Sequence, residues 1–391
     1  MSPVVVRSSL CVVLTAINIQ TVAGQIRFQR PQLSAGQDTN DAGAYVQHAR
    51  DLLDIPTDSA HAAAEAALIW ASRIDPGSGD PPYFLAVAVL RPIMVQARRA
   101  GHLSKRLLRR ELPPRRVAYV DSLLREAWLR EPFYDIDLEA LLCPDLVDPH
   151  LILDPATRGY FAYQFKNSQL ALDSWAEAIA REPQRVDLRL HRAHTFYWMQ
   201  QYDSAANELR AALATQGADS ESSVTLKPRY MLEYALGVAM ERAGHVDSAK
   251  EAYHRALVDN LGLYMAHVRL SNIVFSQGDT ALGLGEIVQA VEVAPREPWL
   301  ASYFGYQLLK AGRSREAAQQ LAIAIALDSA YAASYFLLGM VQSLLRLHTD
   351  ALASFENFLR RSPVNDERRG WTIQRVSALR TALSGSVGPR D

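Results

Sequence analysis

The sequence predicts an all-α protein built as a solenoid of stacked helix pairs. Small residues recur every 34 positions, at Ala249, Gly283, Ala317 and Ala351. A large apolar residue follows four positions after each of them. Small residues let two helix axes approach closely, and large residues fill the facing gaps. A fixed period of this length is therefore typical of a two-helix unit that repeats along the chain.

Other positions keep the same period. A second small residue stands twelve positions before the first, at Gly237, Ser271, Gly305 and Gly339. The predicted turn between the two helices carries Gly244, Gly278, Gly312 and, in the fourth copy, Arg346. Glycine at this place supplies the left-handed cap that ends a helix. Prolines follow the second helix at Pro295 and Pro363.

These residues together resemble the tetratricopeptide repeat (TPR) family, whose 34-residue pattern runs leucine-glycine, aromatic, alanine, aromatic, alanine, proline. The resemblance covers about residues 44–363 and is most specific from Tyr160 onward. It implies a right-handed superhelical solenoid of TPR-like helix pairs. The N-terminal segment described below makes it similar to TPR proteins of the exported bacterial type.

Earlier copies of the second-helix pattern can be placed in the same register. Two are clear, at Ala205, Leu209 and Ala212 and at Ala171, Trp175 and Ala178. Two more have poorly fitting first helices, at Val120, Leu124 and Ala127 and at Ala64, Leu68 and Ala71. The polar stretch 216–225 explains the longer spacing before Ala249 as a surface loop.

We therefore expect one continuous solenoid with distinct ends. The predicted segments are a signal peptide (1–24), a flexible leader (25–43), a degenerate TPR-like region with a basic insertion (44–150), the TPR array (151–363), a capping helix (364–384) and a disordered tail (385–391). Composition agrees, because hydrophobic residues make up 49% and charged residues 21% of the chain, enough for a folded protein. An amphipathic helix from Asp366 to Leu383 is expected to cover the last repeat, which would otherwise expose an apolar flank.

The first residues have the pattern of a secretory signal. Arg7 precedes a mostly apolar run from Leu10 to Ile19, and small residues at Ala23 and Gly24 offer a cleavage site. This pattern predicts a periplasmic or extracellular mature protein. The alternative is an uncleaved N-terminal membrane anchor, although the apolar run is shorter than the roughly 20 residues of a spanning helix.

Motifs that carry chemistry are scarce. His191 and His194 lie three positions apart on one predicted helix, but no third ligand has suitable spacing for a metal site. Gly283-Leu284-Gly285 follows no predicted strand, so we interpret it as helix packing and not as a nucleotide-binding loop. We expect no catalytic residues, no metal and no cofactor, and we interpret the chain as a non-enzyme.

A basic stretch from residue 98 to 116 is the most unusual local feature. It contains Arg98, Arg99, Lys105, Arg106, Arg109, Arg110, Arg115 and Arg116, against the single acid Glu111. One interpretation is a contact with an anionic membrane surface or an acidic partner. We favour the other, in which this is the exposed face of a long helix whose leucines pack on the solenoid. Nucleic acid is not expected as a partner.

The family resemblance also indicates a binding surface. In TPR proteins the first helix of each pair lines a concave groove, and the corresponding positions imply the partner-binding residues Tyr160, Tyr163, His194, Tyr197, Trp198, Tyr234, Arg269, Asn272, Trp299, Tyr303, Tyr306 and Phe336. Such a groove is rich in aromatic residues, which dominate binding hot spots.

The sequence thus favours a non-catalytic TPR scaffold that binds a protein or peptide partner in an aromatic-rich groove, in the bacterial envelope. Two alternatives stay open at this point. One is a membrane-surface assembly factor that docks through the basic stretch 98–116. The other is an enzyme whose site has no recognised motif.

Overall fold

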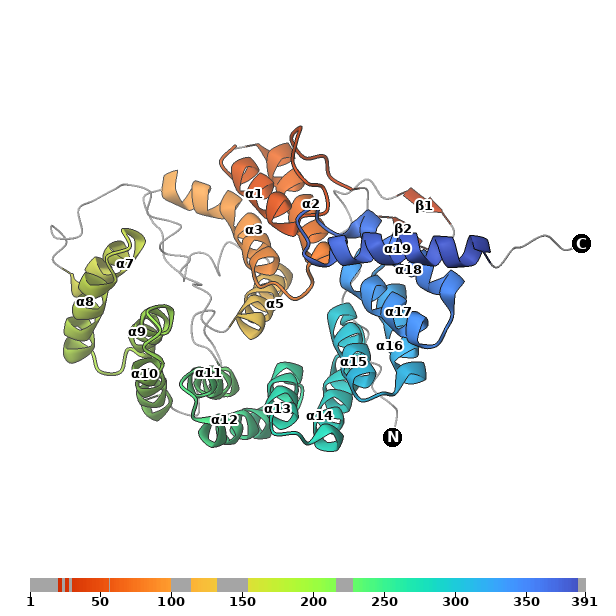
Figure 1. Cartoon of the computed structure of the whole chain (residues 1–391). Coiled ribbons are helices and arrows are strands. Elements are labelled where there is room, and N and C mark those ends of the chain that lie inside the picture. Colours follow the sequence, from red (N-terminus) through yellow and green to blue (C-terminus); the bar gives the residue numbers. More distant parts are fainter. Residues whose placement is uncertain are drawn as a thin grey trace, which may run out of the picture.

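The computed structural model describes residues 20–22, 25–27, 30–55, 57–99, 114–131, 154–215 and 228–385. Within these residues the chain is helical apart from one short hairpin, and the helices follow one another along a curved path (Figure 1). An all-α solenoid was predicted from the sequence, and the structure confirms it. Two parts can be distinguished, an N-terminal block and a longer array.

The N-terminal block contains four helices within the residues that the structure describes. They are α1 (Ala42–Leu53), α2 (Asp58–Ile74), α3 (Asp80–Arg99) and α5 (Pro114–Arg130). Their apolar faces form a core of their own, which includes the predicted second-helix positions Ala64, Leu68 and Ala71 and Val120, Leu124 and Ala127. The block is therefore a small helical unit with its own buried interior.

The array consists of six helix pairs and a final helix within the described residues. The first helices are α7 (Pro155–Gln164), α9 (Val186–Trp198), α11 (Arg229–Arg242), α13 (Tyr264–Ser276), α15 (Pro298–Lys310) and α17 (Ala332–Leu344). The second helices are α8 (Ser168–Arg181), α10 (Tyr202–Thr215), α12 (Val246–Asp259), α14 (Thr280–Val293), α16 (Ser314–Leu327) and α18 (His348–Arg361). The final helix is α19 (Arg368–Gly385).

The turn inside each pair has the same backbone conformation. One residue in every turn takes a positive φ, between 58° and 88°, at Lys166, Gln200, Gly244, Gly278, Gly312 and Arg346. The next N–H then bonds back to a carbonyl near the end of the first helix, as His245 does to Met240 at 2.9 Å. This hydrogen bond closes the helix end with a left-handed cap. The sequence predicted the last four of these turns and missed those at Lys166 and Gln200, which carry no glycine.

Helix pairs pack closely because a small residue faces a large one. A Cβ at Gly339 would come within 2.7 Å of the ring of Phe355, sixteen positions later in the chain. Gly237 faces Tyr253 and Gly305 faces Leu321 in the same way, and the two residues of each pair are again sixteen positions apart in the sequence. The small residues that defined the period are buried as predicted, at Ala249, Gly283, Ala317 and Ala351.

The final helix covers the last repeat as expected. Val376 and Leu379 of α19 are buried together with Ala351 and Phe355 of α18. Trp371 contacts the rings of Phe355 and Phe336 but keeps 48% of its surface exposed. The structure begins this helix at Arg368, two residues after the start predicted at Asp366.

A short hairpin lies near the N-terminus. Strand β1 (Gln20–Val22) pairs antiparallel with β2 (Gln25–Arg27), with Thr21 opposite Ile26. Most of the predicted signal peptide lies outside the described residues, including both candidate cleavage positions. Among the helices of the described part, none has the length and apolar character to cross a bilayer.

The packing register can be tested on α16. Ala324 is fully buried between closely packed helices, whereas Ala322 on the same helix is exposed. We expect Ala324→Asp to place an unpaired charge in the core and to lower the free energy of unfolding by about 3 kcal/mol. Ala322→Asp should change it by less than about 0.5 kcal/mol. Urea denaturation followed by circular dichroism measures both, and equal midpoints for the two variants would contradict the assignment of the buried face.

Candidate protein-binding surface

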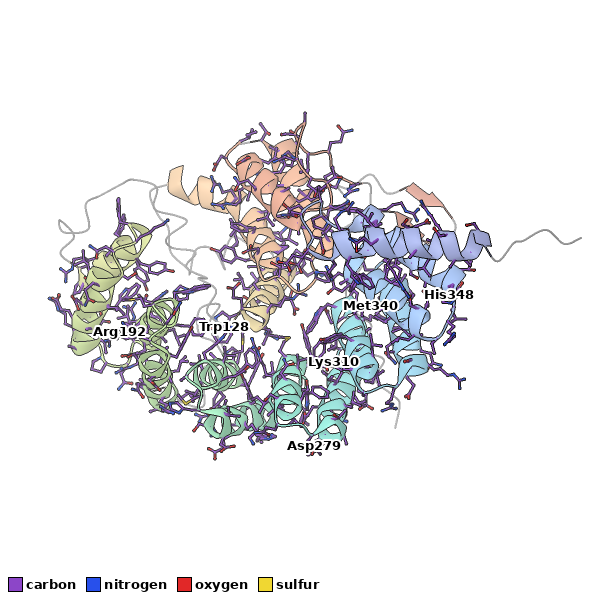
Figure 2. The ribbon with its side chains drawn as sticks, viewed as in Figure 1. Trp128, Arg192, Asp279, Lys310, Met340 and His348 are labelled. Carbon is purple, nitrogen blue, oxygen red and sulfur yellow. The ribbon has the colours of Figure 1, made fainter. Side chains whose placement is uncertain are left out.

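The first helices of the array lie on the inner side of its curve. In Figure 1 the helices α9, α11 and α13 face α5, while their partners α10, α12 and α14 lie on the outer side. The predicted partner-binding residues all belong to the first helices, whose side chains are drawn as sticks in Figure 2. The structure divides these residues into four environments along that side.

At the α7–α9 end, several predicted residues form one aromatic cluster. Tyr163 lies 5.4 Å from the ring of His194, and the indole N–H of Trp198 donates to Nε2 of His194 at 2.8 Å. Tyr160 packs edge-on against His191 at 4.8 Å between ring centroids. Trp198 keeps 53% of its surface exposed, so this cluster has a large aromatic side chain at its edge.

The two histidines considered for a metal site belong to this cluster. Nε2 of His194 accepts the hydrogen bond of the Trp198 indole, and the ring of His191 stacks on Trp175 at 5.4 Å. Both imidazoles thus take part in aromatic packing. The described ranges contain no cluster of three or more histidine, cysteine, aspartate or glutamate residues that could hold a metal ion.

Further along, α13 and α15 present an exposed patch. The Tyr303 hydroxyl donates to Oδ1 of Asn272 and accepts from Nε2 of Gln307 at 2.9 Å. Tyr306, on the next turn of α15, is 39% exposed, and the ammonium group of Lys310 lies 5.6 Å from its ring centroid. We call Asn272, Tyr303 and Tyr306 the open patch. This patch combines aromatic surface with hydrogen-bonding groups on the inner side.

The far end of the inner side is covered by the C-terminal helix. The Phe336 ring lies 5.7 Å from Trp371, and the guanidinium of Arg368 stands 5.4 Å from the Phe336 ring centroid. Phe336 was predicted to contact a partner from its place on the first helix. In the structure its neighbours are residues of α18 and α19.

Tyr197, between the aromatic cluster and the middle of the inner side, is partly buried. Its ring lies 5.3 Å from Tyr202 of α10. Burial raises the pKa of its hydroxyl, and the nearby charges of Arg242 and Arg269 oppose that rise. Tyr197 thus helps to pack the first helix of its own pair against the second.

The middle of the inner side is occupied by the N-terminal block. The last turn of α5 inserts Trp128 and Leu129 into the largest apolar core of the array, where each is only 6% exposed. Earlier residues of the same helix, such as Leu124 and Ala127, belong to the core of the block. One helix therefore joins two hydrophobic cores, and we call this contact the junction.

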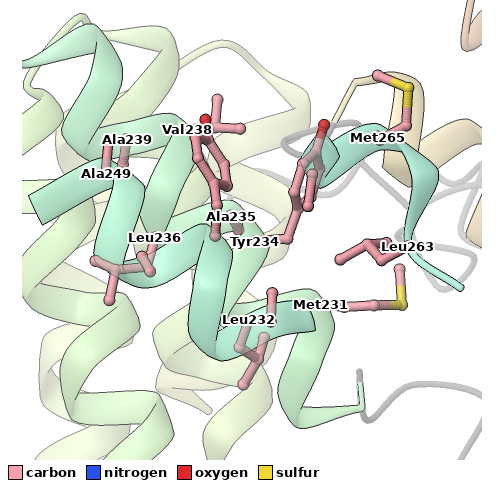
Figure 3. Packing of buried hydrophobic residues seen from close by; sticks show 14 of the residues in the cluster. Met231, Leu232, Tyr234, Ala235, Leu236, Val238, Ala239, Ala249, Leu263 and Met265 are labelled. Atoms are coloured by element: carbon pink, nitrogen blue, oxygen red, sulfur yellow. The ribbon is translucent and has the colours of Figure 1, made fainter. Parts of the chain in front are cut away.

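Hydrogen bonds from the array orient the end of α5. The hydroxyl of Tyr234 donates to the carbonyl oxygen of Leu129 at 3.0 Å, and that of Tyr264 donates to Oε1 of Glu126 at 2.8 Å. Figure 3 shows Tyr234 in the buried layer that it forms with Met231 and neighbouring residues of α11 and α13. Trp299 packs beside Tyr264, with 6.1 Å between their ring centroids.

Arg130 ties the junction together electrostatically. It bonds Glu126 at 2.8 Å and lies 3.6 Å from Glu297 of the array. Burial by itself would lower the pKa of Arg130, but the negative charge of Glu126 and its neighbours raises it overall. The pKa of Glu297 is raised, first by burial and then by Glu126, and Arg130 opposes that rise. Arg130 is thus the positive charge that two neighbouring carboxylates share.

Arg269 lies beneath this region. Its guanidinium lies 3.7 Å from Glu241, whose other oxygen accepts the hydroxyl of Tyr253 at 2.6 Å. Burial would lower the pKa of Arg269, but the neighbouring Tyr234, Tyr253 and Glu241 raise it. Arg269 therefore stays positively charged and interacts with the hydroxyl of Tyr234, which in turn donates to the carbonyl of Leu129.

Two further contacts attach the block to the C-terminal end of the array. Arg73 of α2 makes a bidentate ion pair with Asp328 of the α16–α17 loop, both distances being 3.1 Å. In the leader, the side chain of Asn40 donates to the carbonyl of Arg360 at 3.1 Å, and Asp38 accepts from the backbone N–H of Val364 at 2.7 Å. These contacts bring segments about 250 to 330 positions apart in sequence into one closed arrangement.

The basic stretch 98–116 falls largely outside the described residues. Arg98 and Arg99 form the end of α3, and Arg115 and Arg116 lie exposed in the first turn of α5. The predicted surface loop 216–225 is outside the described residues too. The membrane-surface interpretation of the basic stretch stays a prediction.

Residues of the junction were largely missed from the sequence. Tyr234 and Trp299 had been expected on the inner face, but Tyr264, Glu126, Arg130 and Glu297 had not been singled out. No local pattern marks these four residues. They form one contact only in the folded chain, where residues of α5 lie against array residues more than a hundred positions away in the sequence.

Comparisons with known proteins find partial likenesses among solved structures only. No protein-family model matches the chain, and no curated protein sequence matches it. Among solved structures, the C-terminal part of a TPR repeat-containing protein from Cytophaga hutchinsonii is 12% identical, over 52% of this chain and 78% of that one, with a TM-score of 0.44. YrrB, described as a TPR protein with an unusual peptide-binding site, is 18% identical over 50% of this chain and 95% of its own, with a TM-score of 0.38. MamA is 16% identical over 46% of this chain and 94% of its own, also with a TM-score of 0.38.

These likenesses cover about half of this chain at low structural similarity, so the description of the array rests on the chain's own geometry. From Gly244 to Arg346 the left-handed turn recurs every 34 residues, each time between two helices that pack a small residue against a large one. The array is a solenoid of TPR-like helix pairs. On the inner side of this array lie the aromatic cluster, the open patch and the bound C-terminal end of α5.

The junction yields a direct stability test. Tyr234→Phe removes the hydroxyl that satisfies the buried carbonyl of Leu129, so we expect a loss of about 1–2 kcal/mol in the free energy of unfolding. Tyr306→Phe, at an exposed position of the open patch, should cost less than about 0.5 kcal/mol. Chemical denaturation measures both variants. A Tyr234→Phe protein as stable as the Tyr306→Phe control would show that the Leu129 contact does not form.

Proposed function

We propose that this protein is a non-catalytic scaffold whose TPR array binds a segment of another protein on its inner side. The carrying observation is that this side already holds a helix end through apolar insertion, a backbone carbonyl and an ion pair. A surface that recognises one helix in this way has the shape and hydrogen-bonding groups for protein recognition. No covalent step is required of it.

The open patch and the edge of the aromatic cluster are the proposed contact sites for the partner. Trp198 and Tyr306 offer large, rigid aromatic area at low entropic cost, which is typical of interface hot spots. Asn272 adds an exposed amide that can bond to a partner's backbone. The contribution of each residue depends on how well the partner excludes water around it.

The proposed location is the bacterial envelope. The support is the N-terminal pattern of Arg7, an apolar run and small residues at Ala23 and Gly24. Mass spectrometry of the protein purified from its host reads the N-terminal residue directly. A mature chain that begins at Gly24 or Gln25 agrees with export, and a chain that retains the apolar run contradicts cleavage.

A binding experiment tests the scaffold function. A partner is first recovered with the intact protein from envelope extract of its host, and its affinity is then measured by calorimetry against variants. We expect Trp198→Ala combined with Tyr306→Ala to weaken binding by about tenfold or more, because truncation of an aromatic hot spot costs about 2 kcal/mol.

The matched control changes apolar side chains on the second helices. Val258 and Leu282 are 82% and 64% exposed on α12 and α14, and Val258→Ala with Leu282→Ala should leave the affinity unchanged. If the control pair weakens binding while the inner-side pair does not, the partner binds elsewhere and the proposed function of the inner side is wrong.

A further inference from the structure

We propose that the end of α5 is a resident, displaceable ligand of the TPR array, and that the middle of the inner side receives the C-terminal end of a partner helix with the same chemistry. This inference rests on the proposed function, since it concerns the regulation of the same surface. In this proposal α11, α13 and α15 form a binding site for helix ends. The N-terminal block competes with the partner helix for that site.

The receptor recognises a helix C-terminus by its backbone. The last carbonyl groups of a helix have no partners within the helix, and together they carry partial negative charge. Leu129 is the penultimate residue of α5, and its carbonyl accepts from Tyr234. The positive charge of Arg269 interacts with the same Tyr234 hydroxyl. A hydroxyl donor with a partly buried cation beside it suits the negative end of a helix.

Side chains then select which helix can bind. Tyr264 donates to Glu126, and Glu297 attracts Arg130, so an acid and a base four positions apart are both matched on the array. Between them Trp128 and Leu129 fill the apolar core. The fitting partner is therefore an amphipathic helix that ends in an acidic residue, two large apolar residues and an arginine, at the spacing Glu126 to Arg130.

The contacts at the junction would allow the end of α5 to be replaced by another helix end. Every consecutive pair of array helices packs side by side, whereas helices of the block contact helices of the array only weakly in the described residues. The block has its own core, so it can leave the array without losing its interior. Its attachment depends on the end of α5 and on the polar contacts of Arg73, Asn40 and Asp38.

The charge cluster offers a way to open the junction selectively. Arg130→Glu places a third carboxylate beside Glu126 and Glu297, which should repel the end of α5 from the array. The double variant Arg130→Glu with Glu297→Arg restores opposite charges across the contact. Arg130 is the last residue of α5 and is not fully buried, so circular dichroism should report folded helices in each variant.

Binding of a labelled peptide measures the competition. The probe is a side-chain-stapled, fluorescein-labelled peptide with the sequence of residues 114–131, and fluorescence anisotropy gives its affinity for the full chain. A ligand that must displace a resident segment binds more weakly by the fraction of open molecules. We expect the peptide to bind the Arg130→Glu protein at least about tenfold more tightly than the unaltered protein. The double variant is probed with a peptide that carries Arg130→Glu, so that the charges match, and it should bind this peptide as weakly as the unaltered protein binds the original one.

Two controls make the result specific. A peptide with Trp128→Ala and Leu129→Ala should bind none of the proteins, because it lacks the apolar anchors. Hydrogen exchange of the full chain should show faster exchange at Leu129 and neighbouring amides in Arg130→Glu than in the double variant, which verifies that the junction has opened.

The other outcomes separate the two proposals. Equal peptide affinity for all three proteins would overturn displacement and leave the scaffold function standing. Unchanged exchange in Arg130→Glu would overturn the role of the charge cluster. An opened junction that binds no peptide would overturn the helix-end receptor, and the variants of Trp198 and Tyr306 would then decide independently whether the rest of the inner side binds a partner.

Discussion

The fold depends on one steric register, in which a small residue on the first helix of a pair faces a large residue sixteen positions later. Gly237 with Tyr253, Gly305 with Leu321 and Gly339 with Phe355 all follow it, and each glycine approaches its partner too closely for a Cβ. Because the same register recurs every 34 residues, successive pairs add the same rotation and the array curves. The inner side exists as a consequence of that curvature.

The middle of the inner side is occupied by a segment of the same chain. Trp128 and Leu129 of α5 enter the largest apolar core of the array from its inner side. The contact partly buries Glu126, Arg130 and Glu297, and the raised pKa of Glu297 reflects the cost of that burial. Buried charges of this kind add specificity more readily than stability. The junction is thus better suited to selecting one helix end than to holding the block permanently.

The array could be predicted from the sequence because its cause is periodic. Every landmark returns after 34 residues, so even Arg346 could be assigned to a left-handed turn without a glycine. Lys166 and Gln200 take the same conformation but were missed, because the earlier copies lack the glycine signal. In those turns the hydrogen bonds that close the helix fix the backbone and compensate for its strain, as Asn167 shows by bonding to Ala162.

The junction could not be predicted, because its cause is not periodic. Glu126 and Tyr264 are ordinary residues of their helices, and their 138-position separation leaves no local trace. The family pattern placed Tyr234 and Trp299 on the inner side, but it contains no information about a segment of the same chain that covers them. Phe336 is a similar case, because its cover is the terminal helix.

A photo-cross-link in the full-length protein is the most direct test of this account. Trp299 replaced by benzoyl-phenylalanine places the reactive group beside Tyr264 and the end of α5. On irradiation of dilute protein, the account predicts an intramolecular link between position 299 and the α5 peptide, identified by mass spectrometry after digestion. Links found only within the array, or only to a second molecule, would contradict the self-occupied inner side.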